Sequence, residues 1–322
     1  MVTPRSVDPG SISCPRRPIL VWSGRCGPVL PRSSQLAARN RNAMLEVDGL
    51  VKAFGGFRAV DGCTLRVSKG EILGLIGPNG AGKTTLFNLV AGALQPTLGT
   101  IRFLGEDITT LPTDARFHKG LVRTFQIPHE FHNLTVRENL MMVPPRQPGE
   151  NLFANWFAPG KVRVAEDAVR LKADDTLAFL ELSHVADERA GNLSGGQKKL
   201  LELGRTMMTE AKLVLLDEPA AGVNRTLLRK LEEKILILNR ERGYTFILIE
   251  HDMEMIEKLC APVVCMAEGK VLIQGDFQTV RSDARVLEAY LGETPTAVER
   301  EAAEHDPEVE ELRERELHRE DL

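Results

Sequence analysis

A glycine-rich segment combines the residue types that hold phosphate groups. It reads Gly77-Pro78-Asn79-Gly80-Ala81-Gly82-Lys83-Thr84 and matches the spacing G-x-x-x-x-G-K-[ST]. Glycines let backbone N–H groups turn inward around an anion, and the dipole of a helix that follows favours negative charge. In this pattern the Lys83 ammonium reaches the β- and γ-phosphates, and the Thr84 hydroxyl coordinates Mg²⁺. The segment therefore predicts a phosphate site.

Two carboxylates follow a second apolar segment. Leu213–Leu216 ends on Asp217 and Glu218, with Asp217 lying 134 positions after Lys83. An aspartate at a strand end can join a Mg²⁺ shell, and a neighbouring glutamate can take a proton from an attacking water. By itself, a strand that ends on two acids need only mark where the strand meets solvent. Beside a phosphate loop it indicates nucleotide hydrolysis, with Glu218 as the general base.

A third segment, Leu193-Ser194-Gly195-Gly196-Gln197, precedes a helical stretch at Lys198–Met208. Ser194 fits the N-cap of that helix, and the two glycines let backbone donors approach an anion closely. The simpler interpretation is a turn that starts a helix. Its position 23 residues before Asp217 favours a part in the nucleotide site.

Strands and helices alternate around these motifs, which is typical of an α/β sheet. Leu213–Leu216 and Thr245–Glu250 are continuous apolar runs, as expected for parallel strands covered on both faces. Residues 136–208 are mainly helical, with interruptions at 144–149 and 159–160, and predict a helical insertion. The other expected elements are strands at 45–51, 63–67, 71–76 and 100–103, helices at 83–93 and 225–242, and a hairpin at 263–274.

Composition limits the classes of protein. The chain has 322 residues, of which 43% are hydrophobic and 27% charged, as in folded globular proteins. A net charge of −4 gives no electrostatic argument for nucleic-acid binding, and we expect none. The longest apolar runs, such as Val263–Ala267, fall far short of the roughly 20 residues that span a membrane. Any membrane role is therefore expected to depend on a partner.

Both ends differ in composition from residues 44–292. Residues 1–43 carry seven Arg and one Asp among many Pro, Ser and Gly. This composition suggests a transit peptide, but Pro and Arg interrupt any apolar core of a signal sequence. A disordered basic extension, or a start placed ahead of a true start at Met44, explains it more simply. Residues 293–322 carry twelve acidic and four basic residues, typical of a solvated acidic tail.

The cysteines and histidines lack the spacing of a metal site. Five cysteines are an odd and sparse set for a secreted disulfide framework, so buried thiols in a reducing cytosol are expected. His129 and His132 lie three positions apart, whereas the metalloprotease helix motif needs four. The cysteines are Cys14, Cys26, Cys63, Cys260 and Cys265.

The order of these motifs resembles that of the ATP-binding subunits of ABC transporters. It runs GPNGAGKTT, a lone glutamine at Gln126, LSGGQ, LVLLDEP and then His251 after the next strand. The resemblance covers residues 44–292. It implies an α/β fold with a P-loop NTPase (RecA-like) sheet core, an antiparallel β subdomain and a helical subdomain at about residues 127–209, with ATP and Mg²⁺ as ligands.

The resemblance also implies roles for single residues. Gln126 is expected to sense Mg²⁺ and the attacking water, and His251 to contact the γ-phosphate. Phe54 occupies the place of the aromatic residue that stacks on adenine, with a core phenylalanine as the alternative, and Ser194 would act on nucleotide held by another subunit. The expected nucleotide contacts are Phe54, Gly77, Pro78, Asn79, Gly80, Ala81, Gly82, Lys83, Thr84, Thr85, Ser194, Gly195, Gly196 and Gln197. The expected catalytic residues are Glu218, His251 and Gln126, and the expected Mg²⁺ ligands are Thr84, Gln126 and Asp217.

One position departs from the family pattern. Members often carry an aspartate that crosses the dimer interface after Glu-Pro, and Asn224 stands there in this chain. This departure, Phe54-Gly55-Gly56, the stretch Ile249–Met253 and the long insertion after Gln126 together resemble the ATPases of branched-chain amino acid importers. The ATPases of urea importers share much of this pattern.

Such an importer implies partners. They are two membrane-spanning permease subunits, a second ATPase subunit that is identical or a sister chain, and indirectly a periplasmic solute-binding protein. The chain would then lie peripherally on the cytoplasmic face of the inner membrane. Residues 127–134 mix apolar and aromatic side chains in an expected exposed loop, and in the family this region lines the groove for a permease coupling helix.

Two other classes of protein are alternatives to a transporter subunit. One is a soluble ABC ATPase that works on translation, DNA repair or cluster assembly, and the other is a nucleotide-binding module without turnover. A single ATPase unit and the absence of a sustained heptad argue against the first. The presence of Glu218, Gln126 and His251 argues against the second.

Overall fold

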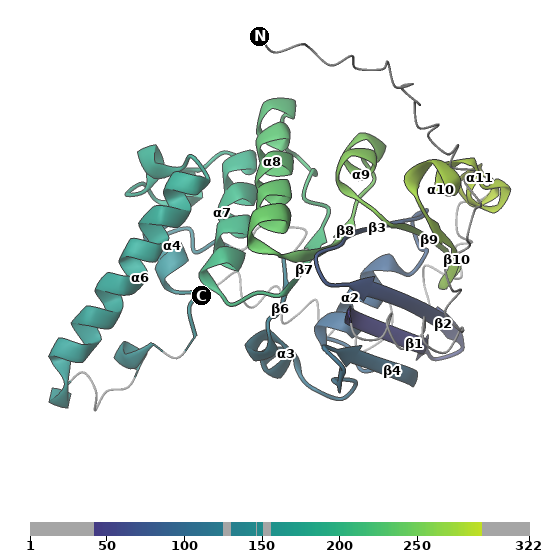
Figure 1. The fold of residues 1–322 in the computed structure, drawn as a ribbon, viewed down its shortest axis with the longest axis horizontal. Helices are drawn as coiled ribbons and strands as arrows, with labels where there is room; N and C mark the ends of the chain where they lie inside the picture. The colour runs from purple at the N-terminus through teal and green to yellow at the C-terminus, as the bar shows by residue number, and fades with distance from the viewer. Residues whose placement is uncertain (1–41, 125–129, 146, 151–155, 292–322) are drawn as a thin grey trace, which may run out of the picture. The chain divides into compact units, whose positions relative to one another are not determined.

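A computed structural model describes residues 42–124, 130–145, 147–150 and 156–291 of the chain. Its centre is a six-stranded sheet in the order β10-β9-β3-β8-β7-β6 (Figure 1). Neighbouring strands run parallel, except in the hairpin of β9 and β10. Four of these strands are buried at every residue because helices or a second sheet cover both faces. The strands are β3 (Ile72–Ile76), β6 (Leu121–Arg123), β7 (Leu213–Asp217), β8 (Thr245–Ile249), β9 (Val263–Ala267) and β10 (Lys270–Gly275).

A second sheet of four antiparallel strands has the order β2-β1-β4-β5. Buried and exposed residues alternate along Cys63–Val67 of β2, which is the period of a strand with one face on the core and one in solvent. This is the antiparallel β subdomain that the sequence predicts. Its strands are β1 (Ala43–Phe54), β2 (Phe57–Ser68), β4 (Leu98–Phe103) and β5 (Glu106–Asp107).

Alternate residues of the central strands feed two separate apolar clusters. In β7, Val214 and Leu216 join the cluster that packs under the helices of one face. Leu213 and Leu215 join the cluster formed with the second sheet and with α2, the helix that follows the glycine-rich segment. The central sheet therefore has an apolar cluster packed on each face, and these two clusters fix the positions of its strand ends. The helices beside it are α2 (Lys83–Ala91), α3 (Thr113–Lys119), α8 (Arg225–Arg242), α9 (Met253–Leu259), α10 (Phe277–Ser282) and α11 (Ala284–Leu291).

The helical insertion packs beside the sheet core. Figure 1 shows its long helix α6 as the element on the side away from the second sheet, with α7 and α8 between them. A pair of ion pairs from Glu181, just after α6, to Lys230 and Lys234 of α8 ties the insertion to the core. Its helices are α4 (Val136–Met141), α6 (Pro159–Phe179) and α7 (Gly195–Met208), with short 3₁₀ turns at Pro148–Glu150, Ser183–Val185 and Ala190–Asn192.

These elements confirm the predicted fold class of an α/β sheet core with an antiparallel β subdomain and a helical subdomain. The helix expected at 225–242 has those bounds as α8. The helix expected at 83–93 ends two residues early, because Gly92 takes the left-handed conformation and caps it. Strand β6 and helix α3 were not expected from the sequence pattern.

Candidate functional site

The glycine-rich segment links the end of β3 to the start of α2. Gly82 is the N-cap of α2 with a φ of 90°, and a Cβ there would lie 2.3 Å from the carbonyl oxygen of Ala59. Gly77, with a φ of 151°, would place a Cβ 2.1 Å from the carbonyl oxygen of Met266. Only glycine fits either position. The backbone shape of this loop is therefore set by the strands around it.

Lys83 begins α2 and is buried beneath the loop. Its ammonium donates hydrogen bonds to the carbonyl oxygens of Gly77 at 2.8 Å and of Pro78 at 2.9 Å. Burial lowers the pKa of Lys83, while the negative charges of Glu218 and then of Asp217 act to raise it. A buried cation whose hydrogen bonds within the described residues go to carbonyl oxygens is well prepared to exchange them for phosphate oxygens. This geometry supports the predicted phosphate contact.

Asp217 ends β7 and is almost fully buried. Its Oδ2 accepts a hydrogen bond at 3.0 Å from the Arg123 guanidinium of the neighbouring strand β6. Arg123 also donates to Asn88 on α2. The pair thus joins two strands to the helix of the phosphate loop. Arg123 was not singled out in the sequence, because 94 positions separate it from Asp217.

The donors predicted for Mg²⁺ are oxygens, which is the ligand type that this ion prefers. The Asp217 carboxylate stands at the strand end, and Thr84 lies exposed in the first turn of α2. The Asp217 carboxylate and the Thr84 hydroxyl are therefore of the ligand type that the predicted metal site requires. Gln126, the third predicted ligand, lies outside the described residues, as do the neighbours of Gln126 from 125 to 129.

Glu218 and His251 come together although 33 positions separate them in the sequence. The Nε2 of His251 lies 3.2 Å from the Oε1 of Glu218. The backbone N–H of Glu218 donates to the carbonyl of Ile249 at 2.9 Å, so the ends of β7 and β8 are fixed to each other. Glu218 has a φ of 47°, a left-handed backbone that is uncommon for residues other than glycine. Such strain is typical of a residue whose position serves a function.

Glu250 is a site residue that the sequence analysis did not identify. It is buried, and its Oε1 accepts from the backbone N–H of Ala220 at 2.6 Å. Its Oε2 accepts from the backbone N–H of His251 at 3.0 Å and of Asp252 at 3.4 Å. Burial raises the pKa of Glu250, and these three hydrogen bonds oppose that rise. Glu250 therefore holds the loop after Glu218 and the loop of His251 in one arrangement.

The predicted N-cap at Ser194 is confirmed. Its hydroxyl accepts from the backbone N–H of Gln197 at 3.4 Å, and the Gln197 side chain accepts from the backbone N–H of Ser194 at 2.9 Å. This reciprocal capping box starts α7. Ser194 and Gly195 are exposed to solvent, so their polar groups face outward from this chain.

The two glycines after Ser194 differ in surroundings. A Cβ on Gly195 would meet only the carbonyl of Gly222, at 3.5 Å, whereas one on Gly196 would lie 2.4 Å from Cδ1 of Leu227. Gly196 is therefore needed for close packing of α7 against α8, a reason that the spacing alone did not reveal. Asn224 caps α8 by accepting from the backbone N–H of Leu227 at 2.9 Å. The departure from aspartate thus retains the helix cap.

Phe54 lies at the end of β1 and is 8% exposed within the apolar cluster between the sheets. The Lys52 ammonium lies 4.8 Å from the centre of its ring. This burial is what the alternative of a core phenylalanine implies. Stacking on adenine stays a prediction.

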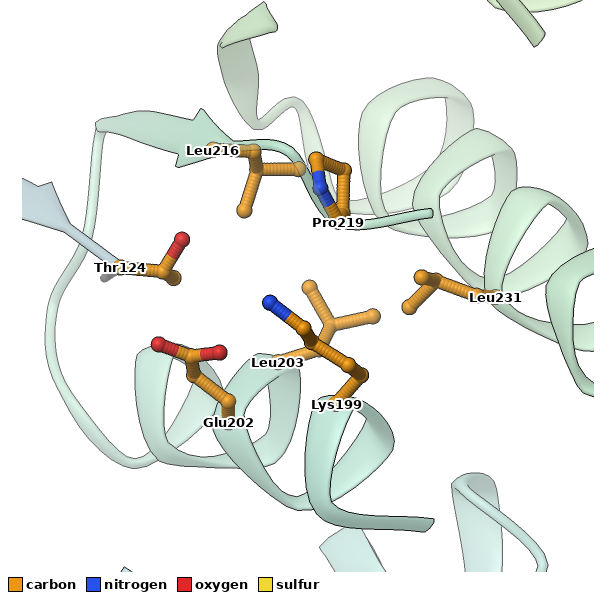
Figure 2. A pocket seen from close by; sticks show the side chains of 7 residues that line it. All are labelled: Thr124, Lys199, Glu202, Leu203, Leu216, Pro219 and Leu231. Carbon is orange, nitrogen blue, oxygen red and sulfur yellow. The ribbon is translucent and has the colours of Figure 1, made fainter. Parts of the chain in front are cut away.

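A small pocket lies where α7 meets the end of β7. Figure 2 shows Lys199 and Glu202 of α7 on one side and Thr124 and Leu216 on the other. Pro219, directly after Glu218, also lines it. Thr124 is the last described residue before Gln126. The pocket therefore lies at the junction of the sheet core and the helical insertion, with Thr124 at its edge.

Residues 130–132 are fastened to α7. Glu130 is buried, and the Lys198 ammonium lies 2.5 Å from its Oε1, with Nδ1 of His132 at 3.1 Å. Phe131 is 47% exposed, as expected for this loop, and the Arg205 guanidinium lies 5.6 Å from the centre of its ring. Two residues of α7 thus hold this segment. His129 of the rejected metalloprotease pattern lies outside the described residues.

Cys63, Cys260 and Cys265 are buried thiols, as predicted, and burial raises their pKa values to about 12, 12 and 11. Cys14 and Cys26 lie outside the described residues.

Within the described ranges no group of three or more His, Cys, Asp or Glu side chains is placed to hold a metal ion. None of the helices in that part of the chain has the length and apolar character needed to cross a bilayer.

Known proteins match this arrangement along most of the chain. A family model described as ABC transporter matches residues 60–221. A probable branched-chain amino acid transport ATP-binding protein of Methanocaldococcus jannaschii is 37% identical over 262 residues, which are 79% of this chain and all of that protein. A high-affinity branched-chain amino acid transport ATP-binding protein of Pseudomonas aeruginosa is 40% identical over 250 residues, 78% of this chain and 98% of that protein.

Solved structures agree with the sequence relatives. A nucleotide-free ATP-binding cassette from an ABC transporter has a TM-score of 0.68 and 38% identity, covering 78% of this chain and 100% of the other. The ADP conformation of an ATP-binding cassette of an ABC transporter has a TM-score of 0.67 and 38% identity, covering 78% and 99%. The resemblance found in the sequence is confirmed. The chain belongs to the ABC transporter family and is one of its ATP-hydrolysing cassettes.

Proposed function

We propose that this chain hydrolyses ATP to drive the import of branched-chain amino acids through separate permeases. The observation that carries the ATPase part is the pair of Glu218 and His251, 3.2 Å apart beside the phosphate loop. The names of relatives that match over nearly their whole length support the solute class. Urea or another solute is the alternative, and a soluble ABC ATPase outside transport is the weaker one.

In the proposed mechanism, the backbone of residues 77–82 and the Lys83 ammonium bind the phosphates of ATP. Glu218 accepts a proton from the water that attacks the γ-phosphorus, and ADP leaves as the bond between the β–γ bridging oxygen and that phosphorus breaks. His251 contacts the γ-phosphate and orients it toward that water. Mg²⁺, held by Thr84 and Asp217 with Gln126, would neutralise negative charge on the phosphates.

Exposure of Ser194 and Gly195 supports the proposal that a second ATPase subunit completes each site. Donors at the start of α7 would then face the γ-phosphate bound by the partner chain. The second ATPase is identical or a sister chain. Two permeases and, indirectly, a periplasmic solute-binding protein complete the proposed assembly, with this chain on the cytoplasmic face of the inner membrane.

The hydrolysis step is tested with Glu218→Gln. The amide keeps the size of the side chain but cannot serve as the base, so turnover is expected to fall about 10²–10⁴-fold, or about 3–5 kcal/mol of barrier. ATP affinity should stay near that of the wild type. Glu233→Gln on the exposed side of α8 is the matched control and should hydrolyse ATP normally. A wild-type rate for Glu218→Gln would remove Glu218 from its assigned role.

The solute is tested by transport. The chain is expressed with candidate permeases and a candidate solute-binding protein, and uptake of labelled leucine and of urea into vesicles is measured. We expect ATP-dependent leucine uptake, and uptake of urea alone would replace the proposed solute.

Phe131→Asp should leave hydrolysis by the isolated chain near normal but reduce uptake, since Phe131 is exposed on the segment proposed to meet the permease.

A further inference from the structure

Two aromatic side chains directly before α6 are unusually exposed. Trp156 is 86% exposed and Phe157 is 79% exposed, the highest values among the large apolar side chains described. The next three residues, Ala158, Pro159 and Gly160, are too small to cover them. In Figure 1 this end of α6 is the one that projects away from both sheets. Adjacent exposed aromatic residues on a projection are typical of an interaction surface.

The same end of α6 carries positive charge. Lys161 and Arg163 are exposed, and the first turn of the helix contains no acidic residue. Cations near a helix N-terminus are unfavourable because the helix dipole is positive there, so helix stability does not explain their placement. Neither forms an ion pair within the described part of the chain. Acidic residues resume one turn later, at Glu166 and Asp167, so the positive region is confined to this end.

We propose that this aromatic tip, formed by Trp156, Phe157, Lys161 and Arg163, docks into a membrane surface rich in anionic lipid headgroups. Tryptophan is enriched at the interface between hydrocarbon and headgroups, where its ring is apolar and its N–H can bind water or phosphate. Lysine and arginine beside it are attracted by anionic headgroups. A fluid surface accepts a projecting tip without a matching hollow, whereas a protein partner needs one. The proposal goes beyond ATP hydrolysis and does not depend on the solute.

The test uses tryptophan fluorescence of the full chain. The chain has two tryptophans, Trp22 and Trp156, so Trp22→Phe leaves Trp156 as the one reporter. Vesicles contain either phosphatidylcholine alone or phosphatidylcholine with one third phosphatidylglycerol, with brominated acyl chains as quenchers. We expect quenching and a blue shift with the anionic vesicles and much weaker changes with the neutral ones.

Variants separate the contributions of ring and charge. Phe157→Ser in the Trp22→Phe chain should weaken partitioning, measured by flotation, about tenfold, because a large apolar group is no longer buried. Lys161→Gln with Arg163→Gln should weaken binding to anionic vesicles about 25-fold, or about fivefold for each cation. The matched control, Leu171→Ser, removes another exposed apolar group about three turns into α6, and should change neither vesicle quenching nor flotation.

ATP hydrolysis by all these variants should equal that of the wild type, since none touches the nucleotide site. Failure of the docking proposal is therefore distinguishable from failure of the proposed ATPase. Absence of quenching in anionic vesicles, or equal flotation of the Phe157→Ser chain and its parent, would overturn the proposal. Shielding of Trp156 only when permease subunits are present would also overturn it and assign the tip to a protein contact.

Discussion

The phosphate loop and the start of α7 are the two regions that we propose to face nucleotide, and they are built in opposite ways. The loop is enclosed by strands, and its lysine is buried against carbonyl oxygens. The start of α7 is exposed at Ser194 and Gly195 and is shaped by its own capping box. The first region is prepared to bind within one chain, while the second is presented outward. The proposed division of the site between two chains would keep nucleotide binding within one chain and leave completion of the site to association of the subunits.

The two regions also differ in how they are supported. Backbone contacts too close for any side chain surround the loop at Gly77 and Gly82. The start of α7 depends on side chains instead. The Leu227 side chain occupies the space that a Cβ on Gly196 would need, and Lys198 forms an ion pair with Glu130. We therefore expect substitutions near α7 to alter stability and association in graded steps while leaving nucleotide binding by the loop intact.

The largest expected effect breaks association without touching the loop. In the Glu218→Gln chain, ATP should persist and hold two subunits together, so an ATP-dependent dimer should elute early on size exclusion. Adding Ser194→Arg places bulk and charge where a phosphate must lie and should abolish that dimer. ATP affinity, measured by titration, should remain within about threefold of the parent, which corresponds to less than about 1 kcal/mol. The reason is that the phosphate loop, and not Ser194 of the same chain, is proposed to bind the nucleotide.

Two outcomes decide this prediction. A Ser194→Arg chain that still dimerises with ATP would contradict the assignment of Ser194 to a partner's nucleotide. If the Glu218→Gln parent forms a dimer only with a sister ATPase, the same test applies to that pair. Lys83→Ala is the opposite control, because it should weaken nucleotide binding itself.

The next effect separates the two adjacent glycines. Gly196→Ala puts a Cβ 2.4 Å from the Leu227 side chain, and overpacking of this kind costs about 1–3 kcal/mol of unfolding free energy. Gly195→Ala meets only a carbonyl at 3.5 Å and should cost less than about 0.5 kcal/mol. Urea unfolding of both variants measures the difference. Equal stability of the two would mean that α7 does not rely on close packing with α8.

A smaller effect concerns the ion pair between Glu130 and Lys198. A double-mutant cycle of Glu130→Gln and Lys198→Met should give a coupling energy of about 1 kcal/mol, since Glu130 is buried while Lys198 keeps partial exposure. Thermal unfolding of the four proteins gives the cycle. Strictly additive effects would show that this ion pair does not help to hold residues 130–132 on α7.

The smallest effect depends on pH. Hydrogen bonds from Lys230 and then Lys234 lower the pKa of Glu181 to about 2 from its usual value of 4.5. Because the folded pKa is depressed, this stabilisation is present above about pH 4.5 and is lost as pH falls toward about 2. Glu181 is half exposed, so wild type and Glu181→Gln should differ by less than about 1 kcal/mol at pH 7. That difference should shrink at pH 3, and a constant difference would contradict the ion-pair explanation.

Local patterns predicted the elements that are long or strongly apolar, and long-range contacts account for what was missed. The central strands and α8 follow from apolar runs and from helical period. Strand β6 has only three residues, too few for a period to emerge. Arg123 and Glu250 find their partners 94 and 30 positions away, so no window of sequence contains either contact. The motif positions, in contrast, were visible because the chemistry of phosphate binding requires adjacent residues.

The left-handed backbone of Glu218 sets stability and activity against each other at one position. A residue with a Cβ pays about 1–2 kcal/mol to adopt this conformation, and glycine does not. Selection for thermal robustness alone would therefore replace Glu218 with glycine and discard the carboxylate. The strained conformation of Glu218 is thus a stability cost that accompanies the proposed general base at the end of β7. Substitutions intended to raise the heat tolerance of this enzyme should therefore be made at positions other than Glu218.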